Sequence, residues 1–346
     1  MKNKISRIQF DNTAFFEILD LEAKRKAQRR DELCSAVIGI PVSNELLEEI
    51  AWLSQSDRDA VLRHHPGYPM ARKMESLWSV LKVFERAHAD LSSQLERFRA
   101  FSLTTEMHKP AGRESLRNIE VSVSKELLAF SASAAALVEH SRRLQKILAI
   151  PLFVEKRGEI FDPPEHRFII EVRNLISHAE FPDVGWQIQY GDIRRTQFLI
   201  TPGNLLESED LHLDSREFIL RCDGVVDVGA MAESYANRVK HFYGWYQRAI
   251  EGAVLPQLQD YRRIVNRSRT ISSRTVHRIL LTHYLSAKID PYKHLDKILL
   301  PEQIKTAMTL PIRSKEQVDL IISLADEHGA CDEELRGMIY KIFDVR

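Results

Sequence analysis

Residues 162–178 read Asp-Pro-Pro-Glu-His-Arg-Phe-Ile-Ile-Glu-Val-Arg-Asn-Leu-Ile-Ser-His, and this stretch carries the clearest helix signals in the chain. Asp162, the proline after it and Glu165 three positions on resemble a capping box at a helix start. Phe181-Pro182 ends the pattern. Between these limits one apolar face is formed by Phe168, Ile169, Val172, Leu175 and Ile176. The stretch therefore predicts an amphipathic helix with one face against a core.

Three further long helices are expected around this one. Apolar residues recur at intervals of three, four and seven over roughly 74–101, 115–149 and 228–254, the spacing of an amphipathic helix. Asp227 is placed to cap the last of them, and Pro256 is expected to kink or end it. The four helices together predict a mainly α fold built as a helical bundle.

The period changes from helical to alternating inside the stretch 184–223. Residues 185–190, and parts of 196–201 and 217–222, alternate apolar with polar side chains, and turn residues separate them. Alternation of this kind is typical of half-buried strands. We therefore expect a small antiparallel sheet of about three strands as a β insertion in the bundle.

Helical appendages are expected on both sides of the core. The predicted regions are an N-terminal helical region at 1–70, a core at 71–270 and a C-terminal region at 271–346. The last should contain short helices, because Pro291, Pro301 and Pro311 interrupt it. Near the first boundary, His64-His65 precedes Pro66-Gly67, which predicts a surface turn.

Composition excludes several classes of protein. The chain has 346 residues, of which 44% are hydrophobic and 28% charged, and no net charge, so it is neither a disordered chain nor a general polycation. The apolar runs predict no membrane span and no signal peptide, which favours a cytoplasmic protein. The cysteines Cys34, Cys222 and Cys331 lie far apart, so neither a disulfide framework nor a thiolate zinc site is expected. No metal or cofactor motif was found.

The last six residues of the opening stretch combine three kinds of chemistry on one helix. Arg173 supplies a cation for phosphate, Asn174 a hydrogen-bonding amide and His178 an imidazole that titrates near neutral pH. An arginine at similar spacing also precedes a histidine elsewhere, as in Arg278 and His283, but only Arg173 is followed by asparagine among these pairs.

The Arg-Asn-x3-His pattern from 173 to 178 resembles the signature of HEPN-superfamily ribonucleases. The resemblance implies a HEPN-like helical bundle acting as a metal-independent endoribonuclease on RNA, without cofactor. By the same resemblance His178 is a general base or acid, Arg173 neutralises charge on the phosphorane, and Asn174 orients His178 or a phosphate oxygen. Such proteins commonly act as toxins or in defence against phage, where an antitoxin or regulatory protein is an expected partner.

Helix geometry adds an expectation about assembly. Asn174 and His178 are four residues apart and share a face, whereas Arg173 and His178 are about 140° apart on an ideal helix. One helix does not readily aim both groups at a single phosphate, but two copies about a twofold axis can. The family builds its sites in this way, so the resemblance implies a homodimer.

A second candidate for contact with RNA is the arginine-rich stretch at 262–278, which contains no acidic residue. In a chain without net charge it is the strongest local concentration of positive charge, and it is suited to phosphate contacts. The proposed RNA-binding residues are Arg262, Arg263, Arg267 and Arg269. A solvated helix end and linker is the competing interpretation.

A rival function belongs to another class of protein. The chain can instead be a non-catalytic helical protein that binds RNA, or a scaffold that binds protein partners through the β insertion and the C-terminal helices. In that case Arg173, Asn174 and Ser177 are the solvated edge of an amphipathic helix.

Overall fold

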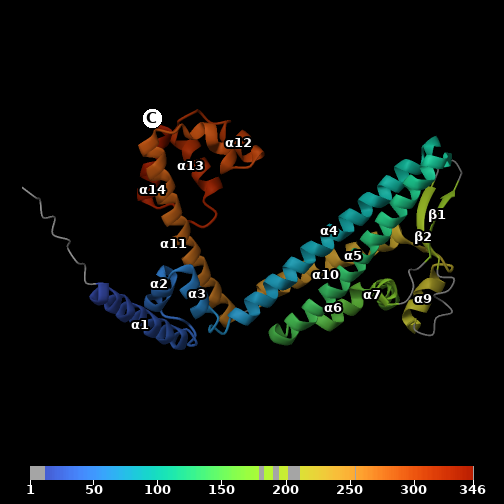
Figure 1. The fold of residues 1–346 in the computed structure, drawn as a ribbon, viewed down its shortest axis with the longest axis horizontal. Coiled ribbons are helices and arrows are strands. Elements are labelled where there is room, and N and C mark those ends of the chain that lie inside the picture. The colour runs from blue at the N-terminus through green and yellow to red at the C-terminus, as the bar shows by residue number, and fades with distance from the viewer. Residues whose placement is uncertain (1–11, 179–182, 190–194, 202–210, 254, 346) are drawn as a thin grey trace, which may run out of the picture. The chain divides into compact units, whose positions relative to one another are not determined.

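The structure is a computed structural model that describes residues 12–178, 183–189, 195–201, 211–253 and 255–345. The chain is mainly α-helical, as predicted, with one small antiparallel sheet. It divides into two compact units (Figure 1): residues 70–254 form one, and residues 1–69 together with 255–346 form the other.

Three long helices make up most of the unit at 70–254: α4 (Tyr68–Ser102), α5 (Pro110–Leu148) and α10 (Val228–Gly252). They run alongside one another in Figure 1. Phe84, Phe130 and Tyr235, one from each helix, form an aromatic cluster with ring centroids 5.1–6.1 Å apart. Burial of these large rings is a main contribution to the core. The predicted helices are confirmed, and Asp227 caps α10 by accepting from the amides of Gly229 and Ala230.

Shorter helices complete this unit. The 3-10 turn η1 (Thr105–His108) links α4 to α5. After α5 come α6 (Phe153–Ile160) and α7 (Pro163–His178), which contains the opening stretch. Two acidic residues tie the start of α7 to its neighbours: Asp162 accepts a hydrogen bond from Arg221, and Glu165 lies 3.1 Å from Arg238 on α10. Burial raises the pKa of Glu165, and Arg238 opposes that shift.

The β insertion contains two of the three predicted strands. β1 (Asp183–Gln189) pairs antiparallel with β2 (Arg195–Thr201), with Trp186 opposite Phe198. The two-residue β3 (Val226–Asp227) completes the sheet. Phe198 meets Phe98 of α4 edge to face at 5.6 Å, so the sheet packs on the end of that helix.

The expected strand at 217–222 was wrong, because this segment belongs to helix α9 (Leu213–Arg221). Ser215, Phe218 and Ile219 are its buried residues, three and four positions apart, which is a helical spacing. The His212 side chain caps the helix by accepting from the Asp214 amide. Packing of Phe218 and Ile219 therefore outweighs the short alternation seen in the sequence.

Among the helices that the structure describes, one, α5, is long and apolar enough to cross a membrane by length and composition alone. It supplies thirteen buried residues, among them Phe130 and Leu137. The same composition also suits a core helix of a helical bundle.

The other unit joins the two ends of the described chain. Its N-terminal part consists of α1 (Asn12–Ala36), α2 (Asn44–Trp52) and α3 (Gln55–Leu62), and its longest helix is α11 (Pro256–Ala287). Ile264 of α11 lies in one hydrophobic cluster with the residues Leu33, Val37, Val42, Leu47, Ile50, Val61 and Leu62. α11 starts at Pro256, the first-turn position that proline tolerates, and it is continuous through residue 270. The predicted core boundary at 270 therefore falls inside a helix.

The C-terminal part has the short helices that its prolines predicted. They are η2 (Pro291–Lys297), α12 (Pro301–Ala307), α13 (Lys315–Ala325) and α14 (Glu333–Phe343). A second hydrophobic cluster holds them together, and its buried members are Leu295, Leu299, Ala307, Val318, Ile321, Ile322 and Phe343.

His65 is buried, so the predicted surface turn at His64-His65 holds for His64 alone. The His65 Nδ1 accepts from the Gly67 amide at 2.9 Å, and its Nε2 lies 3.4 Å from Asp260 on α11. Gly67 sits against the same helix, where a Cβ would come within 2.3 Å of the Gln257 carbonyl oxygen. The turn is buried because α11, distant in sequence, covers it.

Candidate functional site

Helix α7 is fixed to the core by the face opposite to Arg173 and Asn174. Phe168, Ile169 and Val172 are fully buried, and Phe168 packs on Phe218 of α9 at 5.2 Å. Glu171 is also buried: its carboxylate accepts from the hydroxyl of Ser215 and from the His212 amide at 3.2 Å. This satisfied carboxylate ties α7 to α9. The helix that carries the motif is therefore held rigidly up to Val172.

The motif residues follow immediately after this anchored segment. Arg173 and Asn174 are both exposed to solvent. Within the part of the chain that the structure describes, no carboxylate forms an ion pair with Arg173. The backbone of α7 continues to His178, whose side chain lies outside the described residues. Arg173 and Asn174 are thus accessible to a ligand at the end of a fixed helix.

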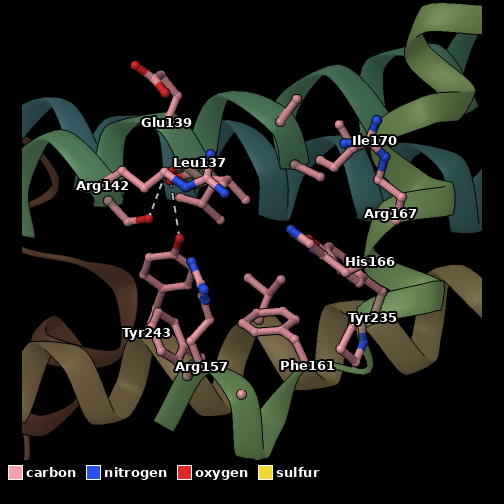
Figure 2. Close-up of a pocket in the computed structure, with 18 of the residues that line it drawn as sticks. Leu137, Glu139, Arg142, Arg157, Phe161, His166, Arg167, Ile170, Tyr235 and Tyr243 are labelled. Atoms are coloured by element: carbon pink, nitrogen blue, oxygen red, sulfur yellow. Dashed lines mark hydrogen bonds between the residues drawn. The ribbon is translucent and has the colours of Figure 1, made fainter. Parts of the chain in front are cut away.

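A cavity of about 380 Å³ lies beside the N-terminal half of α7 (Figure 2). Its lining comes from α5, α6, α7, α10 and the first turn of α9. Three arginines from three helices contribute to it: Arg142 of α5, Arg157 of α6 and Arg167 of α7. In Figure 2, Arg142 and Arg157 lie on one side of His166, and Arg167 lies on the other. The cavity therefore combines a mainly apolar lining with three guanidinium groups.

Positive charge exceeds negative charge in this lining. The lining carboxylates are Glu139 and Asp214, and Glu139 is held by Arg143 at 2.7 Å. Arg167 lies 3.5 Å from Glu171. Among the described residues, neither Arg142 nor Arg157 has an ion-pair partner. Two guanidinium groups are therefore available to an anion.

His166 lies at the side of the cavity as a neutral imidazole. Burial, followed by the charges of Arg157, Arg142 and Arg167, lowers its pKa from 6.5 to about 4. Its Nδ1 lies 2.8 Å from the hydroxyl of Tyr235, whose pKa is raised by burial. Either the hydroxyl or the imidazole can donate in this bond, and Nε2 has no hydrogen-bond partner among the described residues. At neutral pH Nε2 can then form one hydrogen bond with a ligand, as donor or acceptor, without adding charge.

The cavity and the motif lie on one side of α7. His166, Arg167 and Ile170 line the cavity, and positions 173 and 174 follow Ile170 by one helical turn, on the same face. Arg167 and Asn174 are seven residues apart, or about 10 Å along the axis. A chain-like ligand bound at the motif could therefore extend along α7 to the cavity.

The sequence contained a signal for part of this cavity but not for all of it. His166 and Arg167 precede the motif by seven residues on the same helix, so their shared face could have been found by counting. Arg142 and Arg157 belong to other helices and have no such spacing. Only the packing of α5 and α6 against α7 brings them to this side.

Four of the six arginines at 262–278 are paired with carboxylates, one on α11 itself and three on other elements. Asp260 pairs with Arg263 at 2.9 Å, and Glu48 of α2 pairs with Arg267 at 2.6 Å. Arg274 and Arg278 pair with Asp332 and Glu334, both at the start of α14. The concentration of charge read from the sequence is therefore weaker in the fold, because acids distant in sequence lie against α11.

Two arginines of the stretch have no carboxylate partner among the described residues. Arg262 and Arg269 form no ion pair with a carboxylate in the described ranges, and they lie seven residues apart on one face of α11. Of the four arginines predicted to bind RNA, these two keep their charge available.

No group of three or more histidine, cysteine, aspartate or glutamate residues is placed to hold a metal ion in the described parts of the chain. Comparisons with protein-family models, with curated proteins and with solved structures found no significant match.

Proposed function

We propose that this protein is an endoribonuclease of HEPN type, with Arg173, Asn174 and His178 as its catalytic residues. One observation carries the proposal: Arg173 and Asn174 are exposed and available at the end of a helix whose other face is locked into the core. Catalytic groups need this combination of access and rigid support. We propose the cytoplasm as its location and phage defence or a toxin role as its setting.

The proposed reaction is transphosphorylation of RNA. The 2′-oxygen attacks the neighbouring phosphorus, and the bond from phosphorus to the 5′-oxygen breaks. One general base takes the 2′-hydroxyl proton, and one general acid gives a proton to the leaving 5′-oxygen. His178 serves as one of the two, Arg173 stabilises the charge on the phosphorane, and Asn174 orients either His178 or a phosphate oxygen. No metal takes part in these steps.

The angle between Arg173 and His178 leads to a proposed homodimer. About 140° separates the two positions on one helix, so the complete site is proposed to combine α7 from two copies about a twofold axis. An isologous interface of this kind is the commonest arrangement of soluble oligomers.

The chemistry can be tested with a DNA strand that contains one ribonucleotide, in excess chelator. We expect cleavage only after the ribonucleotide, with a 2′,3′-cyclic phosphate on one product and a 5′-hydroxyl on the other, because the nucleophile is the adjacent 2′-hydroxyl. Cleavage of an all-DNA control strand, or loss of activity in chelator, would contradict the proposal. If no nucleic acid is cleaved, the scaffold or RNA-binding function becomes the better account.

A further inference from the structure

The arginine-lined cavity beside α7 has the chemistry of a nucleotide site. We propose that it binds one nucleoside monophosphate unit of the RNA substrate, next to the nucleotide that is cleaved. The proposal rests on the proposed ribonuclease function for the identity of the ligand, and on the geometry of the cavity for the site itself.

The positive charge of the arginines in the lining favours binding of an anion. Arg142 and Arg157 come from different helices, and neither has a carboxylate partner among the described residues. Guanidinium groups bind phosphate through paired N–H donors, and two of them can hold one phosphate from two directions. Arg167 adds a third positive charge on the other side of His166 (Figure 2).

The aromatic residues of the lining suit a ligand with a flat ring, such as a nucleobase. Phe153, Phe161, Tyr235 and Phe242 all line the cavity. Phe161 lies 5.6 Å from Tyr235 and 5.5 Å from Phe242, between ring centroids. Phe153, Tyr235 and Phe242 are buried, whereas Phe161 is partly exposed. Phe161 is therefore the ring that can stack on a nucleobase, a contact with little dependence on sequence. A ligand that combines a phosphate with an aromatic base satisfies both parts of the lining.

His166 provides a neutral hydrogen-bonding group between these parts. Its Nδ1 is occupied by Tyr235 at 2.8 Å, which leaves Nε2 for a ligand. With the proton on Nε2, a base carbonyl oxygen or a phosphate oxygen can accept from it; with the proton on Nδ1, a base amino group or a ribose hydroxyl can donate to it. Because the imidazole is uncharged in both cases, it does not require a second phosphate.

Size and position fit one nucleotide. A volume of about 380 Å³ is near the lower end of the range for small-molecule pockets, about 300–1,000 Å³. The distance along α7 from Arg167 to Asn174, about 10 Å, keeps the cavity within reach of an RNA strand at the motif. RNA-binding proteins commonly take single-stranded bases into such pockets.

Binding is measured separately from cleavage. Titration calorimetry would use 5′-AMP, adenosine, inorganic phosphate and a single-stranded RNA hexamer, with the His178→Ala chain so that RNA stays intact. We expect 5′-AMP to bind more tightly than adenosine or phosphate. The double variant Arg142→Gln/Arg157→Gln should weaken both 5′-AMP and RNA at least tenfold, and Arg142→Lys/Arg157→Lys should restore part of the affinity.

Arg86→Gln is the matched control, since Arg86 is an exposed arginine of α4 in the same unit and is not part of the lining. It should bind both ligands as the parent does, and circular dichroism of every variant should match the parent. Loss of 5′-AMP binding with unchanged RNA affinity would overturn the proposal, because the cavity would then serve a free nucleotide. Unchanged affinity for both ligands would overturn it as well. Neither result depends on whether the parent cleaves RNA.

Discussion

At the scale of single residues, the buried His65 and the partly buried His166 show how the environment sets the charge of an imidazole. His65 and His166 have lowered pKa values, in both cases mainly because burial disfavours the charged ring. For His65 the nearby Asp260 opposes this shift, whereas for His166 three arginines add to it. Both rings are therefore neutral at pH 7, and each is fixed by a hydrogen bond to Nδ1.

The pKa of His166 predicts a pH dependence of stability. A folded-state pKa of about 4 lies below the unfolded value of 6.5, so the unfolded chain binds more protons between these values. The contribution of neutral His166 is complete above pH 6.5 and is lost as the pH falls towards 4. Between pH 7.5 and 5, protonation of His166 in the unfolded chain should lower the free energy of unfolding by about 2 kcal/mol. Between these two pH values, urea unfolding of the parent should show a loss of unfolding free energy about 2 kcal/mol larger than that of His166→Gln. Equal losses in the two proteins would contradict the assignment.

Asp260 is the second residue with a predicted effect on stability. Its carboxylate accepts from the buried Val42 amide at 2.8 Å and pairs with Arg263 at 2.9 Å. Asp260→Ala should lower the free energy of unfolding by about 2–3 kcal/mol, because it leaves a buried amide without a partner. Glu48→Gln, which breaks only the exposed pair with Arg267, should cost less than about 1 kcal/mol. Equal costs in urea unfolding would refute this difference.

At the scale of elements, the long helices and the strands β1 and β2 could be predicted, whereas helix α9 at 213–221 could not. α4, α5, α7 and α10 each repeat the apolar period over several turns, so local pattern and packing agree. The segment 217–222 is six residues long, which is fewer than two helical turns and only three repeats of a strand. Its own pattern is therefore weak, and packing against α7 decides its structure. The same reason explains the burial of His65 beside α11, since no local pattern reports a partner almost 200 residues away.

Some residues of the candidate site could be identified from the sequence, and others could be found only from the fold. Arg173, Asn174 and His178 could be singled out because they occupy one helix at a recognisable spacing. Arg142 and Arg157 reach the cavity only through packing of α5 and α6. The sequence also overestimated the positive charge of the arginine-rich stretch. Part of that charge is neutralised by acids from elsewhere in the chain, namely Glu48, Asp332 and Glu334.

Helix α11 leads to a prediction about RNA binding. Arg262→Gln/Arg269→Gln removes two charges available to phosphates, so we expect weaker RNA binding and a log–log salt slope that is smaller by about 1.4, at 0.7 per contact. Arg274→Gln/Arg278→Gln removes charges already paired with Asp332 and Glu334 and should change the slope little. Filter binding across salt concentrations measures both; equal slopes for the two pairs would rule out an RNA contact at 262–269.

At the scale of the whole molecule, the proposed catalytic site requires two copies of the chain. Multi-angle light scattering at tens of micromolar, a concentration that suits ordinary homodimer affinities, should give twice the mass of one chain, 40.0 kDa. Mixing Arg173→Ala with His178→Ala protein should then restore part of the cleavage activity, because one site of the mixed dimer keeps both groups. A strictly monomeric protein would contradict the shared site.

The proposal that His178 is catalytic is tested most simply by comparing it with His283, since each histidine lies five residues after an arginine. His178→Ala should reduce RNA cleavage at least a thousandfold, in the range for an essential acid or base, with an unchanged thermal midpoint. His283→Ala, in which an exposed histidine of α11 is removed, should cleave as the parent does. Undiminished cleavage by His178→Ala, or equal losses in both variants, would contradict the assignment of α7 as the catalytic helix.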